Sequence, residues 1–401
     1  MNNSNALTSL ILLPEVQDFM ALHENDDTVT IPLKYTTKVD FDLGAITQQI
    51  ELRQKAKKKI KTFITASILL LPKLYEQSTH EEVAQYKATF ISGHSLLDAT
   101  AGLGIDTFFI GKNFKQITCL ESNSSHLEIL RHNYHQHHFK AKLLNISLEE
   151  FLKTTTEHYD VIYVDPDRRP DANRKFIDID QCTPNIIELK KDLLDRAKEV
   201  WIKLSPMIDI NTIMSNFSPH VSVLHCISHH NEMKEILVCL KSGEQKTTYA
   251  ASNIAAANTT YFTSDYNNTK PLLSAPLSYL FEPNVALIKS KLCMEYSIQN
   301  NLRVIYPNGY FFTTDHPEEQ LQGRLFQIIQ VLPYKKGLLT QFIKQNEIKK
   351  ANISCRNFFW KPEEVKKQLK LSDGGEWYLF CYNDASKKPI TVWAKKLSII
   401  K

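Results

Sequence analysis

Hydrophobic and polar residues follow one pattern in the first ninety residues and another beyond them. Between residues 44 and 74, apolar residues recur at helical spacing and leave one face to lysine and arginine, which predicts an amphipathic, basic helix. Around Ser78 two capping boxes overlap, each a hydroxyl residue followed three positions later by glutamate, and they predict the start of another helix. We therefore expect residues 1–90 to form an N-terminal helical region.

From residue 95 the pattern changes to short apolar runs separated by helical segments. This alternation is typical of an α/β protein whose parallel sheet is covered by helices on both faces. Only His229–Lys234 separate the last two runs, too few residues for a crossover helix, so that pair is predicted to be an antiparallel hairpin. The expected strands are Ser95–Asp98, Gln116–Leu120, Ala141–Asn145, Tyr159–Val164, Glu199–Leu204, Val221–Ser228 and Glu235–Leu240, with helices near residues 105–112, 124–137 and 186–197.

The rest of the chain is predicted to be a connection followed by a small α+β unit. Residues 243–270 are rich in polar residues and are expected to connect two parts of the protein. Beyond them, Pro307-Asn308-Gly309 separates two strand-like runs, and an Asn-Gly pair in that position is a strong hairpin signal. A helix at 362–369 and strands at 377–382 and 390–393 are expected to follow.

Composition supports a folded protein with more than one domain. The chain has 401 residues, of which 43% are hydrophobic and 23% charged, as in soluble globular proteins. No apolar run approaches the roughly 18–20 residues that a bilayer requires, so neither a membrane span nor a signal peptide is expected. The seven cysteines are odd in number and form no C-x-x-C pair, which predicts reduced thiols and a cytoplasmic location.

The formal net charge of +4 is modest, but the charge is unevenly distributed. The first thirty residues contain five acidic residues and no lysine or arginine. Residues 331–401, in contrast, contain 15 Lys/Arg and 6 Asp/Glu. A basic C-terminal region is the charge feature that a function must explain.

A glycine turn follows the first predicted strand. In the run from Asp98 to Asp106, Gly102 and Gly104 allow the backbone to pass close to a ligand, and the helix that follows offers unpaired N–H groups. A tight turn without a ligand is the alternative. Glu121 ends the next strand, where a carboxylate can accept hydrogen bonds from both ribose hydroxyls of an adenosine. The two features together favour a nucleoside cofactor.

The type of cofactor follows from one missing glycine and two acids. The dinucleotide fingerprint has a third glycine, but position 107 is threonine. Asp98 and Asp106 would attract the sulfonium and ammonium groups of S-adenosylmethionine and would repel a pyrophosphate. S-adenosylmethionine is therefore preferred over NAD.

A proline-containing turn follows the fourth predicted strand. It reads Asp165-Pro166-Asp167-Arg168-Arg169-Pro170 and lies beside the switch point of the sheet, where open α/β sheets bind ligands. A fixed turn can aim oxygen acceptors at a planar amine, as the related Asp-Pro-Pro turns of nucleic-acid methyltransferases do. Asp165 would orient the amine and Asp167 would be a base, with Pro166 and Arg168 in the same turn. In the alternative, Asp165 only caps the turn and the arginines are surface residues.

These motifs resemble those of class I S-adenosylmethionine-dependent methyltransferases that carry a ferredoxin-like segment and a THUMP-like domain at the C-terminus. Six parallel strands that end in one antiparallel hairpin are also the arrangement of that sheet. The resemblance implies a class I methyltransferase domain at residues 91–245, a ferredoxin-like segment at 275–321 and a THUMP-like domain at 322–401. It is carried by Glu76-Gln77-Ser78-Thr79, Tyr86-Lys87-Ala88, Asp98 to Asp106, Asp165 to Arg169, Lys203 to Asp209, Glu282-Pro283-Asn284, Gly323-Arg324, Ala351-Asn352-Ile353, Arg356-Asn357-Phe358, Asp373-Gly374-Gly375 and Tyr378-Leu379-Phe380.

The resemblance implies an enzyme that methylates RNA, because THUMP domains in related enzymes bind tRNA. C5 methylation of a pyrimidine is disfavoured, since Lys203-Leu204-Ser205-Pro206 after the fifth strand lacks the cysteine nucleophile. A base nitrogen of tRNA or rRNA is the expected acceptor. Asn145 stands where an acid commonly contacts the adenine amine, and its carbonyl can make that contact. The expected cofactor-binding residues are Asp98, Thr100, Ala101, Gly102, Gly104, Asp106, Glu121, Asn145 and Asp165.

Several basic residues are candidates for RNA contact, although solvated lysines are the alternative. The histidines between residues 126 and 138 are expected on a solvated helix face, without a metal. A non-catalytic RNA-binding or assembly factor that retains the fold, and a protein or small-molecule methyltransferase, remain the alternative functions. The candidate RNA contacts are Lys57, Lys58, Arg324, Lys349, Lys350, Arg356 and Lys361.

Overall fold

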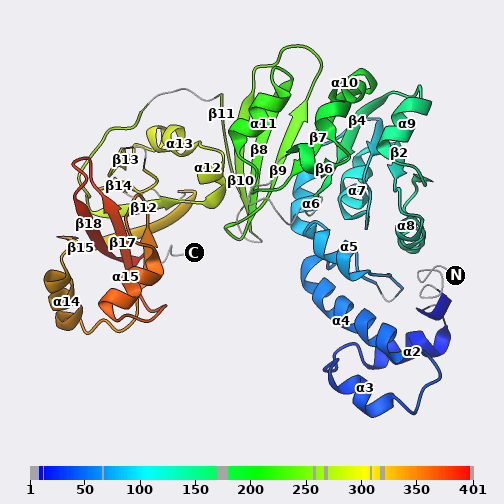
Figure 1. Cartoon of the computed structure of the whole chain (residues 1–401), viewed down its shortest axis with the longest axis horizontal. Helices are drawn as coiled ribbons and strands as arrows, with labels where there is room; N and C mark the ends of the chain where they lie inside the picture. Colours follow the sequence, from blue (N-terminus) through cyan, green and yellow to red (C-terminus); the bar gives the residue numbers. More distant parts are fainter. Residues whose placement is uncertain are drawn as a thin grey trace. The chain divides into compact units, whose positions relative to one another are not determined.

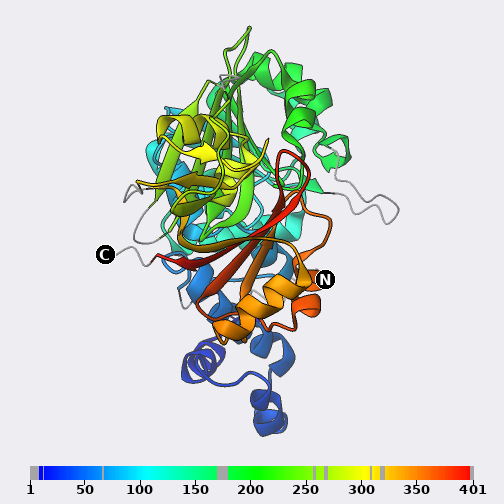
Figure 2. The ribbon, with the colours of Figure 1, turned by 90° about the vertical axis from the view of Figure 1, so that its left-hand side faces the viewer.

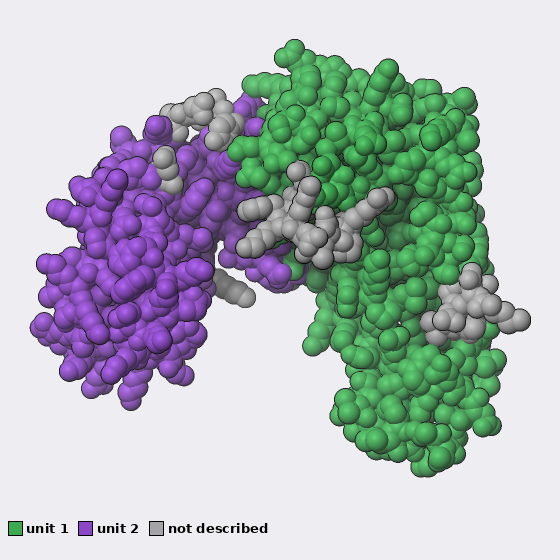
Figure 3. Space-filling model, in the orientation of Figure 1, with its two compact units in different colours: residues 1–224, 234–247 green, residues 225–233, 248–401 purple. Residues whose placement is uncertain are grey.

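The computed structural model describes residues 9–11, 13–65, 67–168, 179–255, 259–265, 270–307, 309–316 and 321–397. The chain divides into two compact units (Figure 3). The first unit comprises residues 1–224 and 234–247, and the second comprises residues 225–233 and 248–401. In the described parts of the chain, no helix combines the length and the apolar character needed to cross a bilayer.

The N-terminal region is helical, but its long helix is shorter than predicted. α4 begins at Leu43 and ends at Lys59, because the residues after it form an extended segment whose backbone is bound by side chains from elsewhere. For example, Gln49 bonds both the N–H and the C=O of Leu70, and Asn133 does the same for Leu69. The helices are α2 (Pro14–Leu22), α3 (Thr30–Tyr35), α4 (Leu43–Lys59), α5 (Pro72–Gln77) and α6 (Glu81–Lys87).

The start of α6 is close to the predicted position but uses another cap. His80 is the N-cap, and its ring nitrogen accepts from the Glu82 N–H. The Thr79 hydroxyl bonds Asp106 instead of its own helix, and the Ser78 hydroxyl bonds the Tyr75 carbonyl. The predicted capping boxes are therefore wrong in detail, because these hydroxyls have tertiary or preceding-turn partners.

One hydrophobic core joins the N-terminal helices to the central sheet. It contains Ile46, Ile50 and Phe63 from the N-terminal region together with Phe108 and Leu130 from two helices that flank the sheet. All five residues are buried, and the most exposed of them, Phe108, is only 8% exposed. The N-terminal helices thus share one core with the helices that flank the sheet, within the first unit.

The central sheet has nine strands in the order β11-β10-β8-β9-β7-β4-β1-β2-β3 (Figure 1). Strands β3, β2, β1, β4 and β7 are parallel, and β9 is antiparallel to β7. The strands are β1 (Ser95–Asp98), β2 (Gln116–Leu120), β3 (Lys142–Leu144), β4 (Tyr159–Val164), β7 (Ala197–Leu204), β8 (Val221–His229) and β9 (Glu232–Leu240). The flanking helices are α7 (Ile105–Ile110), α8 (Ser124–Gln136), α9 (Leu148–Thr154), α10 (Ile186–Arg196) and α11 (Ile210–Phe217).

The predicted antiparallel hairpin is confirmed, but its turn is shorter than the predicted His229–Lys234, and the hairpin does not lie at the edge of the sheet. β8 and β9 are neighbours joined by two residues, His230 and Asn231, which have φ angles of 49° and 62°. Two consecutive residues with positive φ are typical of the type I′ turn, which matches the twist of paired strands.

The segment predicted as a connection contains two further strands of the sheet. β10 (Thr248–Ile254) and β11 (Thr260–Ser264) pair antiparallel, and β10 lies beside β8. Their polar residues are satisfied by the neighbouring strand, since the Ser252 hydroxyl lies 2.8 Å from Nε2 of the buried His225. Polar composition alone therefore misidentified the segment as a connection.

The second unit contains a seven-stranded sheet in the order β13-β14-β12-β15-β18-β17-β16. β12 pairs with β15, so the predicted boundary at residues 321–322 lies between two paired strands of one sheet. The elements are β12 (Tyr279–Pro283), α12 (Val285–Lys289), α13 (Cys293–Gln299), β13 (Arg303–Val304), β14 (Phe312–Thr314), β15 (Gly323–Pro333), α14 (Lys336–Gln345), β16 (Asn352–Cys355), α15 (Pro362–Leu369), β17 (Trp377–Asn383) and β18 (Pro389–Lys396).

Each face of this sheet has its own core. α14 lies across one face of the sheet (Figure 2), and there Leu339 of α14 and Val365 of α15 pack with Trp377 and Trp393. Phe326 and Phe380 face the other way, toward Phe311 and its neighbours. β13 and β14 pair antiparallel as the Asn-Gly signal predicted, although Asn308 itself lies outside the described residues. A small α+β unit at the C-terminus is thus confirmed.

Candidate active site

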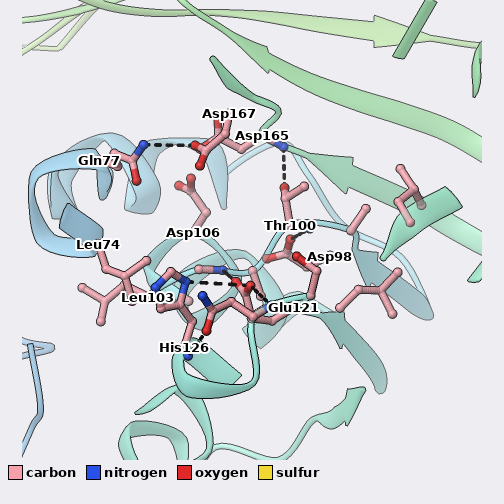
Figure 4. Close-up of a pocket in the computed structure, with 18 of the residues that line it drawn as sticks. Leu74, Gln77, Asp98, Thr100, Leu103, Asp106, Glu121, His126, Asp165 and Asp167 are labelled. Carbon is pink, nitrogen blue, oxygen red and sulfur yellow. Dashed lines mark hydrogen bonds and ion pairs between the residues drawn. The ribbon is translucent and has the colours of Figure 1, made fainter. Parts of the chain in front are cut away.

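A cavity of about 280 Å³ lies in the first unit at the carboxyl ends of β1, β2 and β4. The glycine turn after β1, Glu121 after β2 and the turn after β4 contribute to its lining (Figure 4). Lys203 of β7 lines it as well. Residues from α5 of the N-terminal region complete the lining. Parallel strands that end at one edge bring these distant segments together, at the edge where the sequence predicts the ligand site.

The two glycines of the turn have different roles. Gly102 and Gly104 have φ angles of 52° and 78°, which favour glycine. A Cβ atom on Gly104 would lie 2.4 Å from Cδ1 of Leu130, so this residue is required for packing against α8. On Gly102, the nearest atom to a Cβ would be Cδ2 of Leu74, 3.9 Å away. Gly102 therefore borders the open space of the cavity.

Glu121 is held at the cavity by backbone donors. Its Oε2 accepts from the Gly102 N–H at 3.2 Å, and its Oε1 accepts from the Asn123 N–H at 2.8 Å. A carboxylate has about four acceptor positions, so two remain for a ligand. The predicted ribose contact is compatible with this geometry.

Asp98 lies beneath the turn and is almost fully buried. Its carboxylate accepts from the Thr100 N–H at 3.0 Å and from the Thr107 hydroxyl. Burial raises the pKa of Asp98 to about 7, although these hydrogen bonds oppose the shift. Asp98 thus anchors the turn, and its charge is weaker near neutral pH than the sequence suggests.

Asp106 belongs to a buried ionic cluster with Lys87, Glu235 and Lys203, which was not predicted. The ammonium of Lys87, which is fully buried, lies 2.7 Å from Asp106 Oδ1 and 2.9 Å from Glu235 Oε1. Tyr163 donates to Asp106 Oδ2 at 3.0 Å, and so does Thr79 at 2.7 Å. Burial would raise the pKa of Asp106, but Lys87 and Lys203 outweigh it and hold that pKa at about 2. Asp106 is ionised and already paired, rather than a free attractor for the cofactor.

Lys203 also lines the cavity, although its position there was not predicted. Its ammonium pairs with Asp165 and lies 3.7 Å from Asp106 Oδ2. Burial raises the pKa of Asp165, and the Lys203 charge only partly offsets it. The Asp165 N–H also donates to the Thr100 hydroxyl at 2.7 Å, which joins the turn after β4 to the turn after β1. Lys203 lies in a motif that carried the resemblance, which is the signal that could have identified it.

The rest of the Asp165 turn extends toward the solvent. Pro166 is buried, whereas Asp167 is exposed and accepts from Gln77 Nε2 at 3.1 Å. Asp167 and Arg168 form β5, which pairs with β6 (Cys182–Thr183). The Arg168 side chain and residues 169–178 lie outside the described residues, so the predicted role of Arg168 stays a prediction.

One predicted cofactor-binding residue, Asn145, lies outside the cavity lining among the described residues. Its amide donates to the carbonyls of Glu121 and Ser122 at 2.8 and 3.1 Å and so supports the wall. Ile146 lines the cavity instead. Thr100 and Ala101, in contrast, line it as predicted.

The prediction of a solvated histidine face holds only in part: His135 and His138 are exposed, whereas His132 and His137 contact backbone carbonyls. His132 Nε2 lies 2.7 Å from the carbonyl oxygen of Ser67, and His137 Nε2 lies 2.7 Å from that of Phe63. Together with Asn133 they hold the extended segment between α4 and α5 against α8. Their role is therefore structural, in the packing of the N-terminal region.

The candidate RNA contacts differ in their exposure and in whether an acidic residue pairs with them. Arg324 pairs with Glu282; the glutamate side chain is 6% exposed and the arginine side chain 41% exposed. Lys57 lies 3.1 Å from Glu24 Oε2 but remains exposed on α4, as does Lys58. The other candidates, all in the second unit, are exposed: Lys349, Lys350, Arg356 and Lys361.

The chain is similar to a known domain family, to curated methyltransferases and to a solved structure. The family described as THUMP domain-like matches residues 323–396. Uncharacterized S-adenosylmethionine-dependent methyltransferases from two strains of Mycobacterium tuberculosis are each 21% identical over 299 residues, covering 74% of this chain and 79% of the relative. The crystal structure of a candidate methyltransferase from Porphyromonas gingivalis W83 is 28% identical, with a TM-score of 0.83, and the match covers 96% of this chain and 98% of that one.

These likenesses extend across both units. The match to the Porphyromonas protein spans nearly the whole chain, and the THUMP-like match lies within the second unit. The strand order, the glycine turn after β1 and Glu121 after β2 are the features expected from the sequence for a sheet that binds S-adenosylmethionine. The chain therefore resembles S-adenosylmethionine-dependent methyltransferases over most of its length, and its residues 323–396 match the THUMP domain-like family.

Proposed function

We propose that this protein methylates a base nitrogen in tRNA or rRNA. The observation that carries the proposal is the position of Asp165 and Asp167. Both line the cavity that contains the glycine turn and Glu121, so an acceptor there would lie beside the cofactor site. A THUMP-like match at residues 323–396 favours RNA over a small molecule.

The residues of the first unit suit S-adenosylmethionine. Glu121 would accept from the ribose hydroxyls, and the backbone at Thr100 to Gly102 would approach the methionine part. When bound, the cofactor supplies an electrophilic methyl group, which an acceptor nitrogen takes with its lone pair while a neutral thioether leaves. Asp106 would hold the turn in place through its own ion pairs rather than contact the ligand.

Asp165 would orient the acceptor and Asp167 would receive its proton. The Lys203 ammonium favours the ionised form of Asp165, which can then accept a hydrogen bond from an amine. Asp167 is exposed, so a proton taken from the methylated nitrogen can pass on to water. Positioning supplies most of the catalysis in such a transfer.

The basic residues of the second unit would bind the RNA backbone. Lys349, Lys350, Arg356 and Lys361 are exposed, and the C-terminal stretch has a marked excess of basic residues. Arg324 is left out of this role, because it pairs with Glu282.

Mass-spectrometric nucleoside profiling tests the function directly. Total RNA from cells with and without the protein is expected to differ in one methylated nucleoside. Asp165→Ala should abolish that difference, whereas Asp195→Ala, a change of an exposed aspartate on α10, should not. A protein that supports the cell equally well with Asp165→Ala would be a non-catalytic factor.

Calorimetry tests the cofactor site separately. Glu121→Gln is expected to weaken S-adenosylmethionine binding about 10- to 100-fold, since a hydrogen bond to a charged group is worth roughly 1.5–3 kcal/mol. Glu128→Gln, a matched change of an exposed glutamate on α8, should leave the affinity unchanged. Equal affinity of both variants would contradict the proposed ribose contact.

A further inference from the structure

One wall of the cavity comes from the N-terminal helical region, to which the proposed function assigns no part. Lys73, Leu74 and Gln77 on α5, with Thr79 just after it, line the same cavity as Asp165. In Figure 4, Leu74 lies on the side of Leu103 and the glycine turn, whereas Gln77 points toward Asp167. The same short helix therefore reaches both the cofactor side and the acceptor side.

Hydrogen bonds to two other parts of the first unit hold this wall in place. The Thr79 hydroxyl donates to Asp106 at 2.7 Å, which ties the residues after α5 to the ionic cluster. The Lys59 ammonium donates to the carbonyls of Tyr75 and Glu76 at 2.7 and 3.1 Å, at the carboxyl end of α5. Gln77 is thus presented to the cavity by a fixed element rather than by a loose loop.

The carboxamide of Gln77 has hydrogen-bonding capacity left for a ligand. One N–H donates to Asp167 Oδ1 at 3.1 Å, and within the described residues no further hydrogen bond to this amide is found. A glutamine amide has two N–H donors and one carbonyl acceptor, so one donor and the acceptor remain. Beside them, Asp165 and Asp167 offer only acceptors while they are ionised.

We infer that Gln77 determines which nucleobase is accepted, an inference that rests on the proposed RNA methylation. An exocyclic amine donates to the aspartates, and the ring nitrogen next to it accepts from the free N–H of Gln77. Adenine and cytosine present this pair of groups on the Watson–Crick edge, whereas uracil presents an N–H between two carbonyls. Lys73, exposed on the same wall, has a charge suited to the phosphate of that nucleotide.

The test compares two variants of Gln77 with a matched control. Gln85→Ala changes another exposed glutamine whose Nε2 also donates to a carboxylate, Glu81 Oε1 at 3.0 Å, but which does not line the cavity. Labelled methyl transfer from S-adenosylmethionine into total RNA of a strain that lacks the protein gives kcat and KM. Calorimetry gives the affinity for S-adenosylmethionine, and thermal unfolding reports on the fold.

Gln77→Ala should lower kcat/KM for RNA about 10- to 100-fold, the size expected for loss of a base-reading contact. Gln77→Glu should lower it further, because an acceptor replaces the donor. The affinity for S-adenosylmethionine should stay within about twofold of wild type. Gln85→Ala should match wild type in every measurement.

The outcomes separate the inference from the proposed function. If the wild-type protein methylates RNA and Gln77→Ala behaves like Gln85→Ala, the inference is overturned while the function stands. If Gln77→Ala lowers the unfolding temperature and cofactor affinity along with RNA methylation, its role is structural and the inference is overturned as well. If the wild-type protein binds S-adenosylmethionine but methylates no RNA, the proposed function fails first.

Discussion

Single residues near the glycine turn have roles that differ from those their type suggests. Asp98 and Asp106 are two acids eight positions apart, and both were expected to attract the cofactor. Burial without a cation raises the pKa of Asp98 to about 7, whereas Lys87 and Lys203 hold that of Asp106 at about 2 against burial. Burial and a neighbouring cation therefore shift the pKa of the same type of side chain in opposite directions at these two positions.

Asp98 should make stability depend on pH. Its pKa is raised in the folded protein, so the folded state binds the proton more tightly, and stability should fall as the pH rises from about 4 to 7. Asp98→Asn keeps an acceptor for the Thr100 N–H but cannot ionise. We expect urea unfolding at pH 5 and pH 7.5 to show a larger loss of stability for wild type than for this variant. An identical loss in both proteins would contradict the assigned pKa.

Secondary-structure elements in this protein are joined by ion pairs as well as by apolar packing. Lys87 at the end of α6 contacts Asp106 on α7, Tyr163 on β4 and Glu235 on β9. The cluster therefore connects the N-terminal helices, the glycine turn and the antiparallel strand of the sheet. Paired buried charges of this kind are costly to break one at a time.

Lys87→Met should be strongly destabilising. It leaves the carboxylates of Asp106 and Glu235 buried without this ammonium, which typically costs about 3–5 kcal/mol in the free energy of unfolding. Lys153→Met on the exposed surface of α9 is the control and should change that free energy little. Equal urea midpoints for the two variants would show that the cluster contributes nothing. Adding Glu235→Gln to Lys87→Met should recover part of the loss.

Across the whole molecule, acidic and basic residues concentrate in different parts of the chain. The cavity of the first unit is lined by Asp98, Asp106, Glu121, Asp165 and Asp167, and the basic excess is found in the C-terminal stretch of the second unit. A net charge of +4 hides this division. RNA binding through the second unit should therefore depend strongly on salt, and methyl transfer at the cavity should not.

A fourfold substitution in the second unit tests this division. Lys349, Lys350, Arg356 and Lys361 changed to alanine should weaken RNA binding and reduce the salt slope by up to about 3, since each phosphate contact contributes roughly 0.7–0.9. The affinity for S-adenosylmethionine should not change. The control replaces four exposed lysines of the first unit, Lys115, Lys140, Lys153 and Lys191, which alters the net charge equally. If both sets reduce the slope alike, binding is not specific to the second unit.

The sequence by itself determined the features that depend on neighbouring residues. The seven strands predicted between Ser95 and Leu240, the glycine turn and Glu121 after β2 follow from local hydrophobic pattern and backbone preference. The observed strand ends lie within three residues of the predicted ones, although the short strands β5 and β6 were not predicted. Residues 243–270 were mistaken for a connection, because polar side chains in β10 are satisfied by partners on β8, which local composition does not reveal.

Only the tertiary structure decided which side chains meet. Lys87 reaches Glu235 across 148 positions, Gln77 reaches Asp167 across 90, and Lys203 reaches Asp165 across 38. No local pattern encodes these pairs, since they depend on strand order and on how the N-terminal helices pack against the sheet. The pairing in turn sets the charge of each carboxylate, because burial and a neighbouring cation shift a pKa in opposite directions. The chemistry of the site therefore belongs to the fold rather than to any one motif.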